Sequence, residues 1–428
     1  MKRGRWSVAV VALAGAVVAG CGGGGNDADK VAALPASSCP TPIVHGDAEP
    51  DLLIASDLPL QGASAAQTTQ MGKAIEFILK QRGFKTGKFN VGYQACDDAS
   101  VKAASWDAAR CVANANAYSA NRKVVGVVGP FNSGCAKLEL PILNTAGVPM
   151  VSPASTYTGL TKAGAGAEAG EPSRYSPTGQ RTFARVIAAD DVQGAALATY
   201  ARSDLKLKRV FTVSDGGLSG AELVASFTDQ ARNLGLAIAG SGRWNPKAKN
   251  GTPLARTIAA SGADGVFLAG VAGEGAGALV RDLRAVLGPD FPILLGGGFT
   301  PVESVVKPIV KGAGAATEGV SLSVPGSTAD QLTGAGRTFA TDFGATLNGA
   351  PVQAYTAYAA QAATLLLDAI AASDGTRASV VENVAKAKVT DGILGSFEID
   401  ANGDTTAGAV TVYVVKNGKP ATVRVVIP

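Results

Sequence analysis

Histidine is nearly absent from this sequence, since His45 is the single copy in 428 residues and lies before the first expected strand. No CxxC pair accompanies it, so the sequence offers no zinc-type ligand set. We therefore expect no metal and no cofactor. A Ser-His-Asp triad is not expected either, because no serine or cysteine occupies a nucleophile-elbow sequence. An exported hydrolase with a Ser–Lys or carboxylate pair, assembled only in three dimensions, stays open as an alternative.

Net charge is also small. The formal charge is +4, but three of the 38 Lys and Arg residues lie within the first five positions, which leaves 35 against 34 Asp and Glu. A balance this close to neutral gives no reason to expect a nucleic-acid partner. The turn Asp215-Gly216-Gly217 lacks the GxGxxG spacing and a Walker lysine. We interpret it as a binding-site turn and not as a phosphate loop.

Long apolar runs are limited to residues 8–18, which follow Lys2, Arg3 and Arg5. This run is too short to span a bilayer and is typical of a secretory signal, and no second run predicts a transmembrane helix. It ends Val18-Ala19-Gly20-Cys21, which resembles the lipobox of bacterial lipoprotein precursors. The resemblance implies a signal peptide over 1–20, lipidation of Cys21, and a lipid anchor with a flexible linker over 21–50. The alternative is an ordinary signal peptide with an incidental cysteine.

Cysteines number four beyond Cys21, and an even number in an exported chain indicates disulfides. Three pairings are possible. Cys96 and Cys135 each follow an apolar strand and should lie at the same carboxyl edge of a sheet. We therefore predict Cys96–Cys135, which leaves Cys39–Cys111.

Apolar strands and helices alternate through most of the chain, which predicts an α/β fold with parallel sheets. Helices without strands are expected between 330 and 387, and closing antiparallel strands at Asn402-Gly403 and Asn417-Gly418. We expect strands at 51–56, 89–95, 124–128, 148–151, 183–187, 209–214, 236–240, 265–269, 293–295, 395–400, 409–415 and 421–427, and helices at 67–81, 221–234, 253–260, 274–286 and 302–310.

Small and hydroxyl-bearing residues fill the turns 129–134 and 152–156, which follow adjacent expected strands. Ligands in such sheets bind outside the carboxyl ends of the strands. Ser133 falls where a helix begins, so it could receive a carboxylate together with the helix N–H groups, or it could only cap the helix. Asp190 and Asp191 also open a helix, and we interpret Asp190 as its cap. Tyr157 is a candidate ligand wall.

Several segments together resemble type I periplasmic-binding proteins of the branched-chain amino acid receptor group, which serve ABC importers. The matching segments are 54–62 (IASDLPLQG), 93–97 (YQACD), 129–134, 148–160 (VPMVSPASTYTGL), 185–194 (RVIAADDVQG), 317–320 (TEGV) and 353–358 (QAYTAY). The resemblance implies two Rossmann-like lobes, 51–176 plus 325–390 and 177–324 plus 391–428. Three crossings would join them, and the ligand would bind between them by hinge closure.

The resemblance also implies site residues and partners. The expected ligand-binding residues are Gln67, Asn132, Ser133, Ala154, Ser155, Thr156, Tyr157 and Ser219. Ser219 replaces a frequent aromatic, Val271 and Ala272 replace tyrosines, and the turn 296–298 lacks an acid that would neutralise an ammonium. We therefore expect a small carboxylate or an uncharged ligand in place of a standard α-amino acid. The expected protein is a non-enzymatic, monomeric, extracytoplasmic lipoprotein that docks on an ABC permease, or alternatively a sensor of the same fold.

Overall fold

The computed structural model describes residues 30–426, apart from 63, 165, 246–247, 249, 271–275 and 297–313. The expected signal peptide, Cys21, Val271, Ala272, most of the turn 296–298 and the helix expected over 302–310 lie outside this range. All elements below belong to the unit Val31–Pro428.

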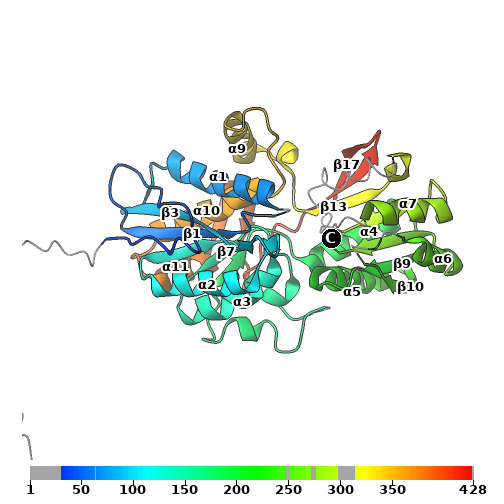
Figure 1. Cartoon of the computed structure of the whole chain (residues 1–428), viewed down its shortest axis with the longest axis horizontal. Helices are drawn as coiled ribbons and strands as arrows, with labels where there is room; N and C mark the ends of the chain where they lie inside the picture. Colours follow the sequence, from blue (N-terminus) through cyan, green and yellow to red (C-terminus); the bar gives the residue numbers. More distant parts are fainter. Residues whose placement is uncertain are drawn as a thin grey trace, which may run out of the picture. The chain divides into compact units, whose positions relative to one another are not determined.

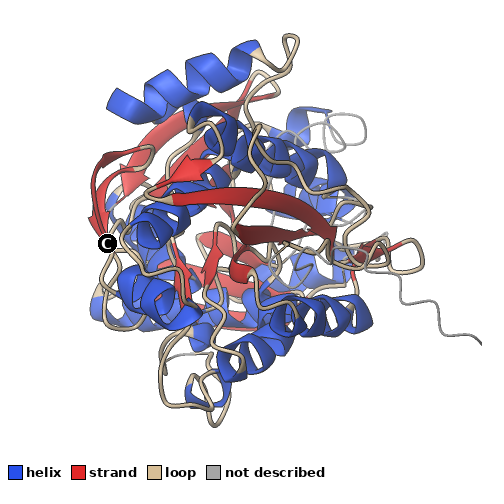
Figure 2. Cartoon of the chain, turned by 90° about the vertical axis from the view of Figure 1, so that its left-hand side faces the viewer, coloured by secondary structure: helices blue, strands red, loops and turns tan. Residues whose placement is uncertain are grey.

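Six strands form the first sheet, in the order β2-β3-β1-β6-β7-β8, and all neighbours are parallel except β2 and β3. Helices cover both faces (Figures 1 and 2): α1 and α10 pack in one apolar core, and α2 and α3 in another. The bounds are β1 Leu52–Leu58, α1 Ala65–Gln81, β2 Lys85–Thr86, β3 Phe89–Asp97, α2 Ala108–Ala120, β6 Val124–Val128, α3 Ser133–Thr145, β7 Met150–Ser152, β8 Phe183–Arg185 and α10 Thr356–Ala371.

Seven strands form the second sheet, in the order β10-β9-β11-β12-β13-β16-β17. It is parallel as far as β13 and antiparallel at its last two pairings. Helices α4 and α5 contribute to one of its cores and α6 and α7 to the other. The bounds are α4 Asp190–Ser203, β9 Arg209–Ser214, α5 Leu218–Asn233, β10 Ala237–Arg243, α6 Thr252–Ala260, β11 Gly265–Ala269, α7 Ala276–Leu287, β12 Ile293–Leu295, β13 Ser321–Pro325, β16 Val410–Lys416 and β17 Lys419–Val426.

Smaller elements complete the unit. The rings of Phe339 and Phe343 in α9 stack on each other, and Phe77 of α1 packs against both of them, edge to face. The bounds are β4 Ala99–Ser100, β5 Ser105–Trp106, η2 Thr158–Leu160, η3 Ser173–Tyr175, η5 Gly314–Thr317, η6 Ala329–Gln331, α9 Gly334–Ala345, α11 Arg377–Ala385, β14 Lys388–Gly392 and β15 Gly395–Glu398.

The α/β prediction is confirmed, and four strands match it residue for residue: 124–128, 209–214, 265–269 and 293–295. The hairpin at Asn417-Gly418 is also confirmed, with both residues at positive φ as a tight turn requires. Two strand assignments were wrong. Strand β8 pairs with β7 and so ends the first sheet, although the expected strand 183–187 was placed in the second lobe. Strand β15 pairs with β14 and not with β16, and the Asn402-Gly403 turn joins only a single bridge, Ile399 to Thr405.

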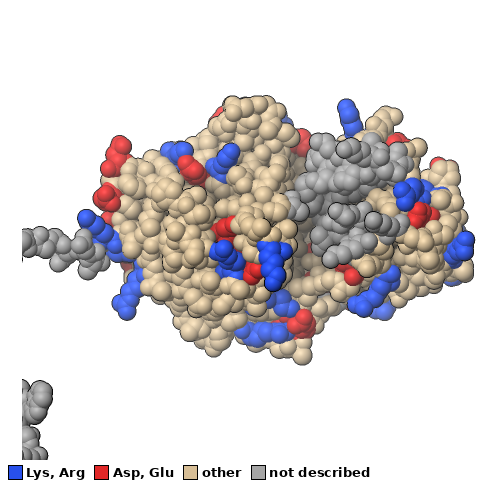
Figure 3. Space-filling view, viewed as in Figure 1, with Lys and Arg blue, Asp and Glu red and all other residues tan. Residues whose placement is uncertain are grey.

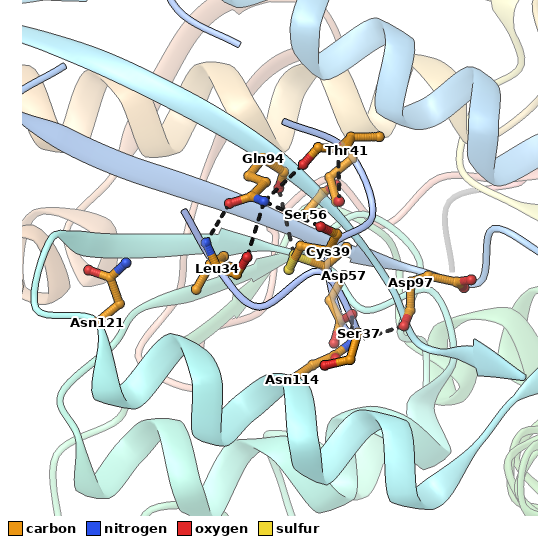
Figure 4. Close-up of a disulfide and its surroundings, with 12 residues drawn as sticks. Leu34, Ser37, Cys39, Thr41, Ser56, Asp57, Gln94, Asp97, Asn114 and Asn121 are labelled. Atoms are coloured by element: carbon orange, nitrogen blue, oxygen red, sulfur yellow. Dashed lines mark hydrogen bonds between the residues drawn. A yellow bond between two sulfur atoms is a disulfide. The ribbon is translucent and has the colours of Figure 1, made fainter. Parts of the chain in front are cut away.

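The predicted disulfides were also wrong, because the structure pairs Cys39 with Cys96 and Cys111 with Cys135. The segment before β1 runs along β3, where Val44 pairs with Tyr93, and this brings Cys39 to Cys96. Gln94 fixes the same segment, since it accepts the N–H of Leu34 and donates to the carbonyl of Thr41 (Figure 4). Cys111 and Cys135 belong to the first turns of the adjacent helices α2 and α3, and their sulfur atoms are bonded to each other.

Two further observations concern the charges on the described surface and the length and hydropathy of the described helices. Lysine and arginine are interspersed with aspartate and glutamate over the described part of the face in Figure 3. Among the helices that the structure describes, none combines the length and the hydropathy that crossing a membrane requires.

Candidate functional site

The loops after β6 and β7 are joined by Ser133, the first residue of α3. Its hydroxyl accepts the backbone N–H of Tyr157 at 3.2 Å. Asn132 is the residue that precedes the helix, and its side chain makes no capping hydrogen bond. Ser133 therefore reaches the neighbouring loop and does not cap its own helix, while the first N–H groups of α3 stay directed at this position.

Ser152, at the end of β7, and Ser155, which follows it, hold the shape of the loop after β7. Ser152 donates to the carbonyl of Pro130 at 2.9 Å and accepts the N–H groups of Ala154 and Ser155. The hydroxyl of Ser155, which is fully buried, also donates to Pro130 at 3.0 Å. Ser155 and the buried Ala154 thus shape the loop and leave Thr156 at its end.

Thr156 meets side chains from two other elements. Asp190, the first residue of α4, donates its backbone N–H to the carbonyl of Thr156 at 2.8 Å. Hydrogen bonding to the side chains of Thr156 and Ser219, the latter in the first turn of α5, lowers the pKa of its carboxyl group against the larger effect of burial. The structure therefore brings together two predicted residues through an aspartate that was expected to be a helix cap. Ala189 occupies the capping position instead.

Asp190 is almost completely buried, and its Oδ2 atom has no partner among the described residues. Burial raises its pKa to about 6, against the opposing effects of Thr156 and Arg185. One carboxylate oxygen at this site is thus a buried acceptor without a described partner.

Glu222 adds a second buried carboxyl group that sequence reasoning missed. Its Oε1 accepts the backbone N–H of Thr158 at 2.8 Å, and its Oε2 has no partner among the described residues. Burial, followed by the charge of Asp190, raises its pKa to about 9. Gly166, at φ +85°, packs so closely that a Cβ there would lie 2.9 Å from the Cα of Glu222. Glu222 is one of the buried residues of α5, together with Leu223 and Phe227.

Arg185 holds the same loop in place, and sequence reasoning missed it as well. This fully buried residue donates to Asp404 at 2.7 Å and to the carbonyls of Ser155 and Tyr157. It donates to the hydroxyl of Thr161 as well, at 2.6 Å. These bonds join the loop carbonyls of Ser155 and Tyr157 to Asp404, so Arg185 positions the loop.

Tyr157 and Gln67 differ from the other predicted residues. The hydroxyl of Tyr157 lies 2.6 Å from the Glu171 carboxylate, and Lys137 lies 4.9 Å from the centre of its ring. The side chain is completely buried in these contacts, and its role as a ligand wall stays a prediction. Gln67, in the first turn of α1, is 3% exposed, and its side-chain amide has no partner among the described residues.

Known proteins resemble this chain over most of its length. A family model described as a periplasmic binding protein matches residues 54–420. The Leu/Ile/Val-binding protein BraC3 of Rhizobium johnstonii is 29% identical over 281 residues, which cover 64% of this chain and 67% of that protein. The Leu/Ile/Val-binding protein homolog 3 of Brucella melitensis is 28% identical over 243 residues, 55% of this chain and 58% of the relative.

Solved structures share the fold. The leucine binding protein LivK of Thermotoga maritima aligns with a TM-score of 0.73 at 23% identity, over 88% of this chain and 99% of that one. A solute binding protein of R. palustris, solved in complex with benzoate, aligns with a TM-score of 0.69 at 20% identity, over 88% and 96%. At these identities the likeness establishes the architecture alone.

Proposed function

This chain belongs to the periplasmic binding protein family, and we propose that it is an extracytoplasmic solute-binding protein of an ABC importer. In this role it captures a small organic molecule and delivers it to a membrane permease, without chemical conversion. The observation that carries the proposal is the family match over residues 54–420, which includes strands of both sheets.

The proposed ligand is amino-acid-like, an amide or a carboxylate. Ser133, Thr156 and the N-terminal N–H groups of α3 suit a carboxylate or an amide carbonyl, because a helix N-terminus favours negative charge. The ligand named for the related structure from R. palustris, benzoate, carries a carboxylate. Asp190 and Ser219 would meet the other end of the ligand, and the unpartnered Oδ2 of Asp190 suits an ammonium or a hydroxyl group.

We further propose that the two sheets form two lobes that close around the ligand, with β8 counted in the first. A monomer held at the outer face of the cytoplasmic membrane through lipidated Cys21 would present the closed form to the permease. Closure is favoured by any ligand that contacts both lobes, since only the closed form makes both sets of contacts.

Thermal unfolding of the mature chain, with residues 1–21 removed, tests this function. We expect a selective rise in the unfolding temperature with members of a panel of amino acids, their desamino analogues, amides and aromatic carboxylates. The rise should be reduced in Ser133→Ala and Thr156→Ala. Thr199→Ala is the matched control, because its hydroxyl bonds to the carbonyl of Ala195 within α4. A panel without any stabilising solute would contradict the proposed function.

A further inference from the structure

Three carboxyl groups lie together in the core beside the Cys111–Cys135 disulfide. Asp57 is in β1, Asp98 directly follows β3 and Glu139 is in α3, and all three are completely buried. An oxygen of Asp57, an oxygen of Glu139 and the Cys135 sulfur lie within 4.8 Å of one another. An oxygen of Asp98 and both disulfide sulfurs form a second group of this size.

Most polar atoms of this carboxyl cluster (Asp57, Asp98 and Glu139) have no hydrogen-bond partner among the described residues. One oxygen of Asp57, one of Glu139 and both of Asp98 are in this state. The hydroxyl of Tyr118, a completely buried side chain of α2, also has no partner among the described residues. Burial, followed by the charge of Asp57, raises the pKa of this hydroxyl. Asn114, also on α2, donates to the other Asp57 oxygen at 2.8 Å (Figure 4).

The charged neighbours of the cluster are acidic. Besides one another, the groups with the strongest influence on the three carboxyls are Asp97, Asn114 and Tyr118, none of which is a cation. The carboxylate of Asp97 is already bonded to the N–H groups of Leu60 and Ala99. Three ionised carboxylates without a counter-ion would be too costly to bury, so protons or a metal ion must neutralise them.

Protons fit the geometry better than a metal ion. Each set of three converging ligand atoms includes a sulfur that is already bonded in the disulfide, and metals bind cysteine as a free thiolate. In addition, Glu139 Oε1 lies 3.5 Å from the Cys135 sulfur. A disulfide sulfur carries no hydrogen, so any hydrogen bond there needs the proton on Glu139.

We propose that Asp57, Asp98 and Glu139 form a proton-binding site of the folded state, in which Glu139 holds one proton and Asp98 another. Water supplies these protons when the chain folds, and they return to water when it unfolds. Folding of the part around α2 and α3 is therefore linked to pH.

The sign of the linkage follows from burial. Burial raises the pKa of Asp98 to about 9 and also raises the pKa values of Asp57 and Glu139 above their usual range. In the unfolded chain the same groups titrate near pH 4. The cluster's stabilising effect is complete below about pH 4 and is lost as the pH rises toward 9.

Urea unfolding at pH 5, 6, 7 and 8, with the disulfides intact, tests the site in the full mature chain. Asp98→Asn removes one titrating group. We expect the wild-type unfolding equilibrium constant to rise about tenfold more per pH unit than that of the variant, since the variant binds one proton fewer. The difference between variant and wild type is the readout, because Asp190 and Glu222 titrate in the same range.

Two further variants complete the design. Glu382→Gln, on the exposed side of α11 and paired with Lys386 at 2.6 Å, should leave the wild-type slope unchanged. Glu139→Gln gives the same test if Asp98→Asn does not fold. Infrared spectra supply an independent readout, since the carbonyl band of a protonated carboxyl should be present at pH 7 and weaker in Asp98→Asn.

The proposal is overturned if Asp98→Asn and wild type show the same slope and the same infrared band. It is also overturned if calcium or magnesium stabilises the wild type over EDTA and this effect disappears in Glu139→Gln. That second result would mean that a metal ion, and not protons, neutralises the carboxyl cluster.

Discussion

At the scale of single residues, Arg185 is the side chain on which the loop after β7 most depends. It is completely buried and donates to Asp404, to two loop carbonyls and to Thr161. Arg185→Lys cannot reproduce this planar set of donors, so it should leave buried acceptors without partners. We expect the free energy of unfolding to fall by about 1–3 kcal/mol for each buried acceptor that loses its partner. Urea unfolding at pH 7 measures this change.

Arg424→Lys is the matched control. Arg424 also pairs with an aspartate, Asp204, at 2.7 Å, but its side chain is 46% exposed. Exposed ion pairs contribute about 0–1 kcal/mol, so this variant should unfold close to the wild type. If both variants lost the same free energy of unfolding, the burial of Arg185 would not be the reason for the effect of Arg185→Lys.

At the scale of elements, the Cys111–Cys135 disulfide ties α2 to α3 next to the site-bearing start of α3. Replacing both cysteines with serine should lower the free energy of unfolding by about 2–5 kcal/mol, as for other native disulfides.

Proteolysis without reduction, followed by mass spectrometry, checks the pairing: linked peptides should join Cys39 to Cys96 and Cys111 to Cys135. A peptide that joins Cys96 to Cys135 would contradict the structure.

The element scale also shows how far the sequence can be interpreted. Apolar runs bounded by turns locate strands such as 124–128 and 265–269 well, because burial on both faces leaves a continuous apolar signal. Pairing partners are less visible in one sequence. Cys135 follows a strand in the sequence, yet it lies in a helix whose nearest neighbour is α2, and β8 is too short at three residues to show which sheet it joins.

The candidate site shows the same division. Ser133 and Thr156 were named because the family resemblance places hydroxyls on these turns, whereas Ser219 was named as a replacement for a frequent aromatic. Asp190 is the side chain that acts with both Thr156 and Ser219. Asp190 itself was assigned to a helix start, where capping is the commoner use of an aspartate. The contact of Glu222 with Thr158 joins residues 64 positions apart, and no local pattern in the sequence indicates it.

At the scale of the whole molecule, Glu222 connects the segment between β7 and β8 of the first sheet to a helix that packs on the second. Its pKa is raised to about 9 by burial and by Asp190, from a usual value of 4.5. The folded form therefore holds a proton that the unfolded chain releases, and stability is lost as the pH rises from about 4.5 toward 9.

Glu222→Gln keeps an oxygen for the N–H of Thr158 but removes this titration. We expect the variant to be increasingly more stable than the wild type from pH 5 to pH 9 in thermal unfolding. Glu222→Ala, which also removes the hydrogen bond, should be less stable than Glu222→Gln at every pH by about 1–3 kcal/mol. A constant difference between Glu222→Gln and the wild type across this range would mean that Glu222 is ionised in the folded chain.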